Sequence, residues 1–181
     1  MAGSTENNIV GKILYTQDEI WQRSKEIAKQ ISEDYAGEEL MLVGTLKGAI
    51  LWMGDIMKNL SIETTIDFMV ASSYGSGTTS SGVVTISKDI DLDLYGKNIL
   101  LIEDIVDTGT TLKFLKEHLA DRRPKSVKIC TLLDKPCGRK ADLEPDYVGF
   151  TVGDLFIVGY GLDYDQRYRD LPYISYLSGN E

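Results

Sequence analysis

One short stretch of the chain, Ile99–Thr111, constrains the fold more than any other. In order, it contains four apolar residues, two acids, two apolar residues, a third acid and a hydroxyl-rich turn: ILLI, ED, IV, D and TGTT. Residues 99–102 are too few for a helix and do not alternate apolar with polar side chains, which predicts a central parallel strand covered on both faces. Helices on both sides of a sheet provide that cover, so the stretch predicts an α/β fold.

The same order of strand, turn and helix occurs earlier in the chain. Residues 40–44 predict a second buried strand, and the turn Thr45-Leu46-Lys47-Gly48 separates it from an amphipathic helix over 49–60. A third apolar run, 127–133, ends at Asp134-Lys135-Pro136. Ligands of open α/β sheets bind beyond the carboxyl ends of the strands, so these polar turns are expected to meet at one binding edge.

Two further helices are predicted. Thr16 and Glu19 have the spacing of a capping box, at the start of an amphipathic helix that continues to Tyr35. The TGTT turn precedes a second helix over 112–120. His118 lies beside the apolar stripe of that helix, which predicts a partly buried packing residue and not a catalytic base.

The other expected strands flank a polar loop and form the tail. Residues 65–70 predict a strand whose hairpin partner is 83–86. Between them, the glycine- and serine-rich segment 72–82 is either an idle flexible loop, which its composition alone favours, or a lid. Two short aromatic-rich strands are predicted in the tail, within 147–150 and 156–164.

Length, charge and cysteine content limit the possible functions. The chain has 181 residues, 43% of them hydrophobic, which predicts a single domain over 1–181. The formal net charge of −9 argues against nonspecific nucleic-acid binding. The absence of a long apolar span predicts a cytoplasmic protein that does not insert into membranes. Cys130 and Cys137 lack the spacing of a zinc site and are expected to be reduced thiols.

Taken singly, each polar feature of the binding edge has an ordinary explanation. Glu103 and Asp104 can solvate a strand end, Thr108 or Thr110 can cap a helix, and Lys47 can be a solvated charge. Taken together, they favour an anion pocket, because a turn at the start of a helix offers hydroxyls and free backbone N–H groups to a phosphate. The turn is not a Walker A loop, and the chain has no GxGxxG fingerprint.

The order of strand, acid pair, third acid and turn resembles the signature of phosphoribosyltransferases that bind phosphoribosyl pyrophosphate. Further matches are spread from Leu46 to Leu171, and the segment VGYGLDY at 158–164 is narrower in distribution than that signature. The whole pattern resembles the bacterial hypoxanthine-guanine phosphoribosyltransferase family. It implies the type I phosphoribosyltransferase fold, a mainly parallel sheet flanked by helices, with a small hood subdomain formed by terminal segments over the active site.

The resemblance also implies a reaction. Phosphoribose passes from phosphoribosyl pyrophosphate to N9 of a 6-oxopurine in the presence of Mg²⁺, and pyrophosphate leaves. Asp107 is the expected catalytic base and accepts the purine N7 proton. Glu103 and Asp104 are expected to engage the ribose hydroxyls and the metal, and Asp163 to lie near the purine and a second metal.

The remaining site residues follow from the same resemblance, group by group. The 5′-phosphate is expected at Thr108, Gly109, Thr110 and Thr111. Pyrophosphate is expected at Lys47, Gly48, Arg139 and Arg169. The purine is expected to receive a hydrogen bond at O6 from Lys135, to stack on Phe156 and to be read at its edge by the backbone of Ile157. Ser73 and Tyr74 match the family's mobile loop, so the resemblance favours a lid over 72–82.

Some questions stay open at the level of sequence. The resemblance implies a homodimer or homotetramer without deciding between them, and it does not rank hypoxanthine against guanine. Members of the family often hold the peptide bond that corresponds to Leu46–Lys47 in the cis form, and the sequence leaves this undecided. Two alternatives remain: a phosphoribosyltransferase for xanthine or a non-purine base, and a nucleic-acid-binding regulator of the same fold, against which the net charge argues.

Overall fold

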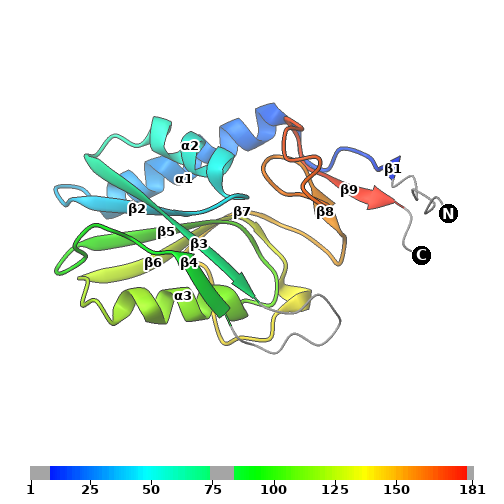
Figure 1. Ribbon diagram of the computed structural model, residues 1–181. Helices are drawn as coiled ribbons and strands as arrows, with labels where there is room; N and C mark the ends of the chain where they lie inside the picture. The colour runs from blue at the N-terminus through cyan, green and yellow to red at the C-terminus, as the bar shows by residue number, and fades with distance from the viewer. Residues whose placement is uncertain (1–8, 74–83, 179–181) are drawn as a thin grey trace.

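The computed structural model describes residues 9–73 and 84–178 of the chain, and within them its main element is a six-stranded sheet. The strand order is β4-β3-β2-β5-β6-β7 (Figure 1). Adjacent pairs are parallel except β3 and β4, which are antiparallel. The predicted α/β fold with a mainly parallel sheet is confirmed. The strands are β2 (Leu40–Thr45), β3 (Thr64–Ser73), β4 (Val84–Lys88), β5 (Asn98–Val106), β6 (Ser126–Asp134) and β7 (Tyr147–Thr151).

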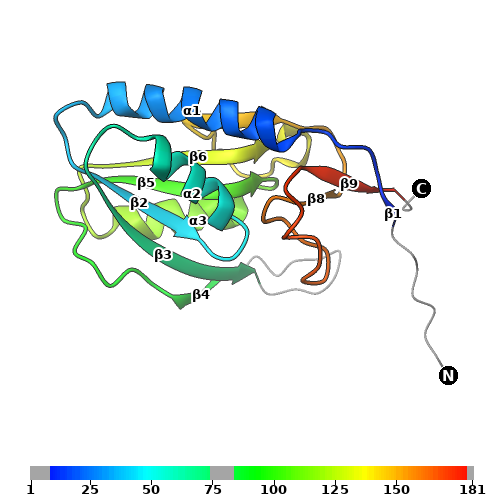
Figure 2. The ribbon, with the colours of Figure 1, turned by 90° about the horizontal axis from the view of Figure 1, so that it is seen from above.

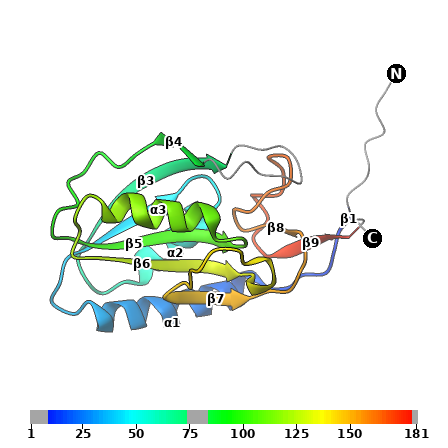
Figure 3. The same ribbon diagram turned by 90° about the horizontal axis from the view of Figure 1, so that it is seen from below.

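Helices cover both faces of this sheet. The helices α1 (Gln17–Asp34) and α2 (Ile50–Asn59) lie on one face (Figure 2), and α3 (Thr110–Ala120) lies on the other (Figure 3). Leu100 and Ile102 of β5 belong to the core on the α1–α2 side, while Ile99 and Leu101 belong to the core on the α3 side. Alternate residues of the strand are thus buried on opposite faces, which explains why its sequence is apolar without a break.

The strand β5 is longer than its apolar run predicts. Its pairing with β2 ends at Gly44↔Ile102, whereas its pairing with β6 continues as far as Val106↔Asp134. Glu103 and Asp104 therefore lie within the strand, whereas the sequence predicted that they follow it. They stand beyond the last residue pair between β2 and β5, where the chain leaves β2 toward α2.

A second, smaller sheet is formed by both ends of the described chain. It contains β1 (Ile9–Val10), β9 (Ser175–Ser178) and β8 (Ile157–Val158), in that order. It lies beyond the carboxyl ends of the parallel strands (Figure 3), and it matches the hood that the family resemblance implied. The expected tail strands are β7 and β8, of which β8 has only two residues.

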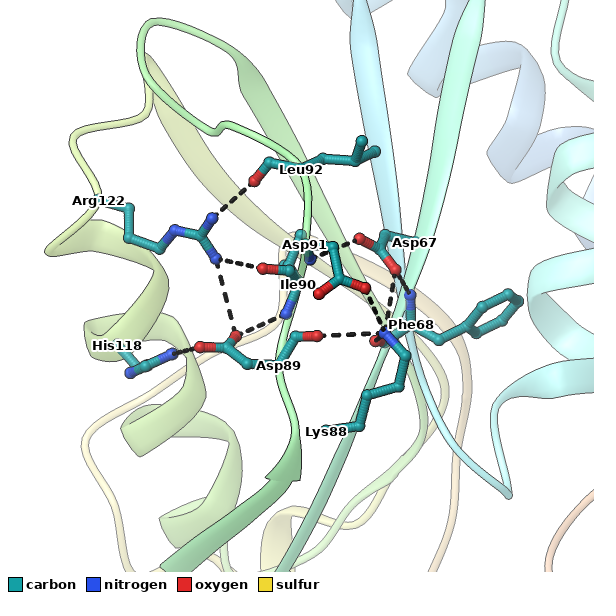
Figure 4. A network of polar contacts seen from close by, with 9 residues as sticks. All are labelled: Asp67, Phe68, Lys88, Asp89, Ile90, Asp91, Leu92, His118 and Arg122. Carbon is teal, nitrogen blue, oxygen red and sulfur yellow. Dashed lines mark hydrogen bonds and ion pairs between the residues drawn. The ribbon is translucent and has the colours of Figure 1, made fainter.

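The connection from β4 to β5 is held against α3 by a network of polar contacts (Figure 4). The Lys88 ammonium contacts Asp67 at 3.4 Å, and the Arg122 guanidinium donates to the carbonyls of Ile90 and Leu92. His118 is partly buried, as predicted, and its Nε2 atom lies 2.8 Å from Asp89 Oδ2. This histidine therefore also anchors the connection.

The lid predicted over 72–82 lies mostly outside the described residues: Ser73 is the last residue of β3, and Tyr74 is not described. Among the described helices, none is long and apolar enough to cross a membrane.

The capping box predicted at Thr16 is present. The Thr16 hydroxyl accepts from Glu19 N–H at 3.3 Å, and Glu19 Oε2 accepts from Thr16 N–H at 2.7 Å. We expect Thr16→Ala to lower the free energy of unfolding by about 1 kcal/mol, because the first turn of α1 loses its cap. Urea denaturation measures this. Glu19→Gln is the control, since glutamine still completes the box; an equal loss in both variants would contradict the assignment.

Candidate active site

Three neighbouring hollows among the described residues lie at the carboxyl ends of β2, β5 and β6. Each is named here by its lining. The turn hollow, about 230 Å³, is lined by the turn 45–48 together with Ala71, Glu103, Asp104, Thr111, Leu115, Asp163 and Arg169. The ring hollow, about 240 Å³, is lined by Asp104, Ile105, Asp107, Lys135, Leu155, Phe156, Ile157, Leu162 and Asp163. The helix hollow, about 160 Å³, is lined by Glu103, Ile105, Val106, Asp107, Thr108, Gly109, Thr111 and Leu112.

The hollows adjoin one another through shared residues. Asp104 and Asp163 line both the turn and ring hollows, Glu103 lines both the turn and helix hollows, and Asp107 lines both the ring and helix hollows. Each volume is below the roughly 300 Å³ of a typical small-molecule site. Together they suit one extended ligand, or two ligands side by side.

The acid pair lies at the centre of the three hollows. Glu103 Oε2 accepts from the Thr45 hydroxyl at 2.7 Å, and Asp104 Oδ1 accepts from the backbone N–H of Ile105 at 2.7 Å. Burial, reinforced by the neighbouring Asp104 carboxylate, raises the pKa of Glu103 to about 8. Burial likewise raises the pKa of Asp104. The position thus favours any ligand that brings positive charge or hydrogen-bond donors to these oxygens.

The turn after β2 forms one wall of the turn hollow. Its Leu46–Lys47 peptide bond is cis, as is often the case in the family that the sequence resembles. Gly48 is packed so closely that a Cβ atom there would lie 1.5 Å from Asp104 Oδ2, so only glycine fits without a shift. The Lys47 side chain is exposed, and its Nζ atom lies 3.0 Å from Gln166 Oε1.

The opposite wall of the turn hollow carries an ion pair. Arg169 Nη2 lies 2.7 Å from Asp163 Oδ1, and Arg169 Nη1 donates to the Gly161 carbonyl at 2.7 Å. The Nε atom of Arg169 is buried and has no hydrogen-bond partner among the described residues. A buried donor without a partner is unfavourable, which makes this guanidinium a candidate ligand contact.

The helix hollow ends at the amino terminus of α3. Gly109 occupies the N-cap position with φ of 74°, a left-handed conformation that glycine adopts easily. Gly109 has no side chain to cap this helix, and the Thr108 hydroxyl accepts a long hydrogen bond of 3.4 Å from the backbone N–H of Thr110. The Thr108 hydroxyl thus binds one N–H group at the start of α3, as an ordinary cap would, and the first turn of a helix is also the kind of site that binds an anion.

Asp107 and Lys135 face each other across the ring hollow. Lys135 Nζ lies 3.8 Å from Asp107 Oδ2 and 2.8 Å from Asp154 Oδ1. The hydrogen bond with Asp154 is the main cause that raises the pKa of Lys135, so the ammonium stays charged. Phe156 is 49% exposed beside the hollow, and its ring packs edge-on against Tyr164 with centroids 5.5 Å apart. Much of this aromatic side chain is thus accessible beside the hollow.

The structure separates Arg139 from the other expected pyrophosphate contacts. Its guanidinium binds the Asp134 carboxylate and donates to the carbonyl oxygens of Asp107, Val106 and Leu143. It does not line the turn hollow among the described residues. These contacts hold its nitrogen atoms beneath the turn that carries Asp107, and a contact of Arg139 with pyrophosphate stays a prediction.

Two residues that the sequence did not single out also belong to the site. Thr45 binds Glu103, and its place at the end of a buried strand, directly before Leu46-Lys47-Gly48, was a signal that could have identified it. Asp154 binds Lys135, but no motif marks it, because the contact joins two different connections between strands.

Comparison with known proteins identifies close relatives. Residues 11–165 match the phosphoribosyl transferase domain family. The hypoxanthine-guanine phosphoribosyltransferase of Streptococcus thermophilus is 49% identical over 168 residues, which cover 93% of each chain. The solved structure of a hypoxanthine phosphoribosyltransferase from Staphylococcus aureus has a TM-score of 0.91 and 46% identity, and the match covers 98% of this chain and 97% of that one. A hypoxanthine-guanine phosphoribosyltransferase from Bacillus anthracis, with a HEPES molecule in its active site, has a TM-score of 0.90 and 44% identity over 94% of this chain and 100% of that one.

The contacts of Arg139 lead to a prediction about stability. The side chains of Arg139 and Asp134 are only 10% and 9% exposed, so Arg139→Gln leaves a buried carboxylate without its partner. We expect a loss of about 3 kcal/mol in the free energy of unfolding. We also expect faster amide hydrogen exchange at residues 106–110. Urea denaturation and exchange measured by mass spectrometry test both effects.

Arg122→Gln is the matched control. Arg122 also binds two carbonyls and a carboxylate, but it is 30% exposed and lies against α3, away from the hollows. Arg122→Gln is expected to lower the free energy of unfolding by less than Arg139→Gln does, and to leave amide hydrogen exchange at 106–110 unchanged. An equal exchange response in the two variants would refute the supporting role of Arg139.

Proposed function

The chain belongs to the phosphoribosyltransferase family, among the hypoxanthine-guanine phosphoribosyltransferases, and we propose that it catalyses purine salvage. In the proposed reaction, 5-phosphoribose passes from phosphoribosyl pyrophosphate to N9 of hypoxanthine or guanine. The products are IMP or GMP and pyrophosphate.

The adjoining hollows are the observation that best supports this proposal. The substrate pair has three chemically different parts: a 5′-phosphate, a sugar bearing pyrophosphate, and a flat oxygenated base. The helix hollow offers N–H groups, the turn hollow offers a cation and acids, and the ring hollow offers an aromatic face beside a lysine. Neighbouring hollows therefore suit neighbouring parts of the substrates.

Relatives in this family use a divalent metal, and we propose Mg²⁺ for this chain. Glu103, Asp104 and Asp163 would hold it, since hard dications prefer carboxylate oxygens and Mg²⁺ usually completes its coordination with water and substrate oxygens. Among the described residues, no group of three or more His, Cys, Asp or Glu side chains is arranged to hold a metal ion. When bound, Mg²⁺ neutralises charge on the departing pyrophosphate.

The two ends of the sugar substrate are bound by different elements. The turn Thr108-Gly109-Thr110-Thr111 holds the 5′-phosphate at the amino terminus of α3. Glu103 and Asp104 accept hydrogen bonds from the ribose hydroxyls. Lys47, Gly48 and Arg169 bind the pyrophosphate that leaves, and the unpartnered Nε atom of Arg169 supports that role. Arg139 acts indirectly, by supporting the Asp107 carbonyl.

The purine occupies the ring hollow. It stacks on the exposed face of Phe156, the backbone of Ile157 reads its edge, and Lys135 donates to O6. Asp107 accepts the N7 proton, which makes N9 a better nucleophile. Its carboxylate also contributes negative charge near a sugar that becomes positive in the transition state. Ser73 and Tyr74 are proposed to close over the substrates and exclude water.

Location and assembly are part of the same proposal. Cys130 and Cys137 are free thiols, as expected in the reducing cytoplasm. Exposed apolar side chains at Ile50, Leu51 and Met57 on α2 support a homodimer or homotetramer.

A screen of bases tests the proposed function directly. Purified protein is given phosphoribosyl pyrophosphate, Mg²⁺ and one base at a time, and pyrophosphate release is measured. We expect turnover with hypoxanthine and guanine. We expect kcat/KM for adenine to be lower by at least about 10³-fold, because its amino group is a donor and cannot accept a hydrogen bond from Lys135. Xanthine and uracil are included to distinguish the related enzyme classes. Absence of pyrophosphate with every base would refute the proposal.

The base role of Asp107 gives a further prediction. Asp107→Asn keeps the shape of the side chain but not its ability to take a proton. We expect kcat to fall by about 10²- to 10⁴-fold, with the Kd of phosphoribosyl pyrophosphate nearly unchanged. Steady-state kinetics and calorimetric titration measure the two quantities. Asp142→Asn, an exposed acid that lines none of the described hollows, is the control. Near-normal turnover of Asp107→Asn would remove the assignment.

A further inference from the structure

A buried contact joins the two walls of the turn hollow from behind. The Tyr160 hydroxyl donates to Asp55 Oδ2, and each of the two residues is only 6% exposed. The other carboxylate oxygen of Asp55 lies 2.8 Å from Lys58 Nζ. Asp55 belongs to α2, the helix that begins directly after the turn 45–48, and Tyr160 belongs to the segment that leads to Asp163.

The backbone around Tyr160 has a conformation that suits its glycines but not the tyrosine itself. Gly159, Tyr160 and Gly161 all have positive φ, at 96°, 50° and 100°. Glycine adopts this region readily, but a residue with a bulky side chain rarely does, so Tyr160 needs outside contacts to remain there. The Tyr160 N–H donates to the Leu171 carbonyl at 2.9 Å, and its ring is fixed at the far end by Asp55.

The backbone of this segment closely approaches the backbone of the turn wall. A Cβ atom at Gly161 would lie 2.0 Å from the Gly48 carbonyl oxygen, so the two glycines are in tight contact. The Gly161 carbonyl also accepts from Arg169 Nη1 at 2.7 Å. The position of Gly161 therefore influences both Gly48 on one wall and Arg169 on the other.

Tyr160 and Asp55 act on the hollow without entering it. Neither is among the described residues that line the turn, ring or helix hollows. We propose that the Tyr160–Asp55 hydrogen bond is a positioning contact that sets the distance between the Lys47–Gly48 turn and the Asp163–Arg169 pair, and so determines the affinity for the pyrophosphate group. This inference rests on the proposed function of the turn hollow.

The electrostatics of the contact agree with that role. Burial, together with the Asp55 carboxylate, raises the pKa of Tyr160, so the hydroxyl keeps its proton and remains a donor. Lys58 balances the charge of Asp55. The contact is thus a fixed hydrogen bond between α2 and the segment that carries Asp163.

Tyr160→Phe tests the inference, because it removes only the hydroxyl. We expect KM for phosphoribosyl pyrophosphate and the inhibition constant of pyrophosphate to rise about tenfold, the effect of losing a hydrogen bond to a charged acceptor. KM for hypoxanthine should change by less than about twofold, because the purine contacts lie in the ring hollow. In Asp55→Asn the side chain still offers an oxygen to the tyrosine hydroxyl. The KM of this variant for phosphoribosyl pyrophosphate should therefore stay near that of the wild type.

The chain supplies a matched control for general destabilisation. The Tyr147 hydroxyl donates to Asp34 Oδ2 at 2.6 Å, and Tyr147 is 3% exposed, but it lies at the amino end of β7, away from the hollows. Tyr147→Phe removes a similar hydrogen bond and is expected to lower the melting temperature without changing either KM.

The outcomes separate the inference from the proposed function. A wild-type protein without activity on any base refutes the proposed function. An active wild type whose Tyr160→Phe variant has an unchanged KM for phosphoribosyl pyrophosphate, or equal changes for both substrates, refutes the positioning role alone. The positioning role is supported if KM for phosphoribosyl pyrophosphate rises selectively in Tyr160→Phe and stays at the wild-type value in Tyr147→Phe.

Discussion

The site depends on one feature of the sheet, namely that β5 extends past the end of β2. Pairing with β2 stops at Ile102, and β5 continues beside β6 as far as Val106. The space that β2 leaves is filled by the Lys47–Gly48 turn, which packs against Asp104. Successive residues of a strand point to opposite faces, so one acid is directed to each side of the sheet. Asp104 reaches the ring hollow and Glu103 reaches the helix hollow, while both line the turn hollow.

This placement is electrostatically unfavourable for the protein without its ligands. Two adjacent carboxyl groups are partly enclosed, and their burial and mutual repulsion raise the pKa of Glu103 to about 8. A sugar with hydroxyl donors, or a dication, relieves that cost at the moment of binding. The fold keeps the acids in place by other means, because β6 pairs with this end of β5 and Arg139 binds the carbonyls beneath the next turn. The stability of the scaffold thus maintains a site that would otherwise relax.

The sequence predicted the parts of this arrangement that are local. The apolar run of β5, the turns after β2 and β5, and the capping box at Thr16 all depend on neighbours within a few residues. The direction of Arg139 and the bond between Tyr160 and Asp55 could not be predicted in this way. The Tyr160–Asp55 bond joins residues 105 positions apart. The direction of Arg139 depends on carbonyls that face the guanidinium only after β5 and β6 have paired. A family resemblance transfers residue types more reliably than side-chain directions, so it could not give the contacts that the Arg139 guanidinium makes within the protein.

The hollows place positively charged groups together in a chain whose net charge is −9. Their cations are few and are held by polar side chains of the protein itself: Arg169 by Asp163, Lys135 by Asp154, and Lys47 by Gln166. Such contacts fix each positive group near the place where a ligand would meet it, so little reorganisation is needed on binding.

The partners of these positive groups differ in how easily a ligand can replace them. Asp154 is 86% exposed, and an exposed ion pair is weak, so a hydrogen-bond acceptor of a ligand can replace it on Lys135. Asp163 is only 25% exposed and lies 2.7 Å from Arg169, so this pair orients the guanidinium, whose buried Nε atom has no hydrogen-bond partner among the described residues. The local order of charges, and not the net charge, therefore determines which anions the site can accept.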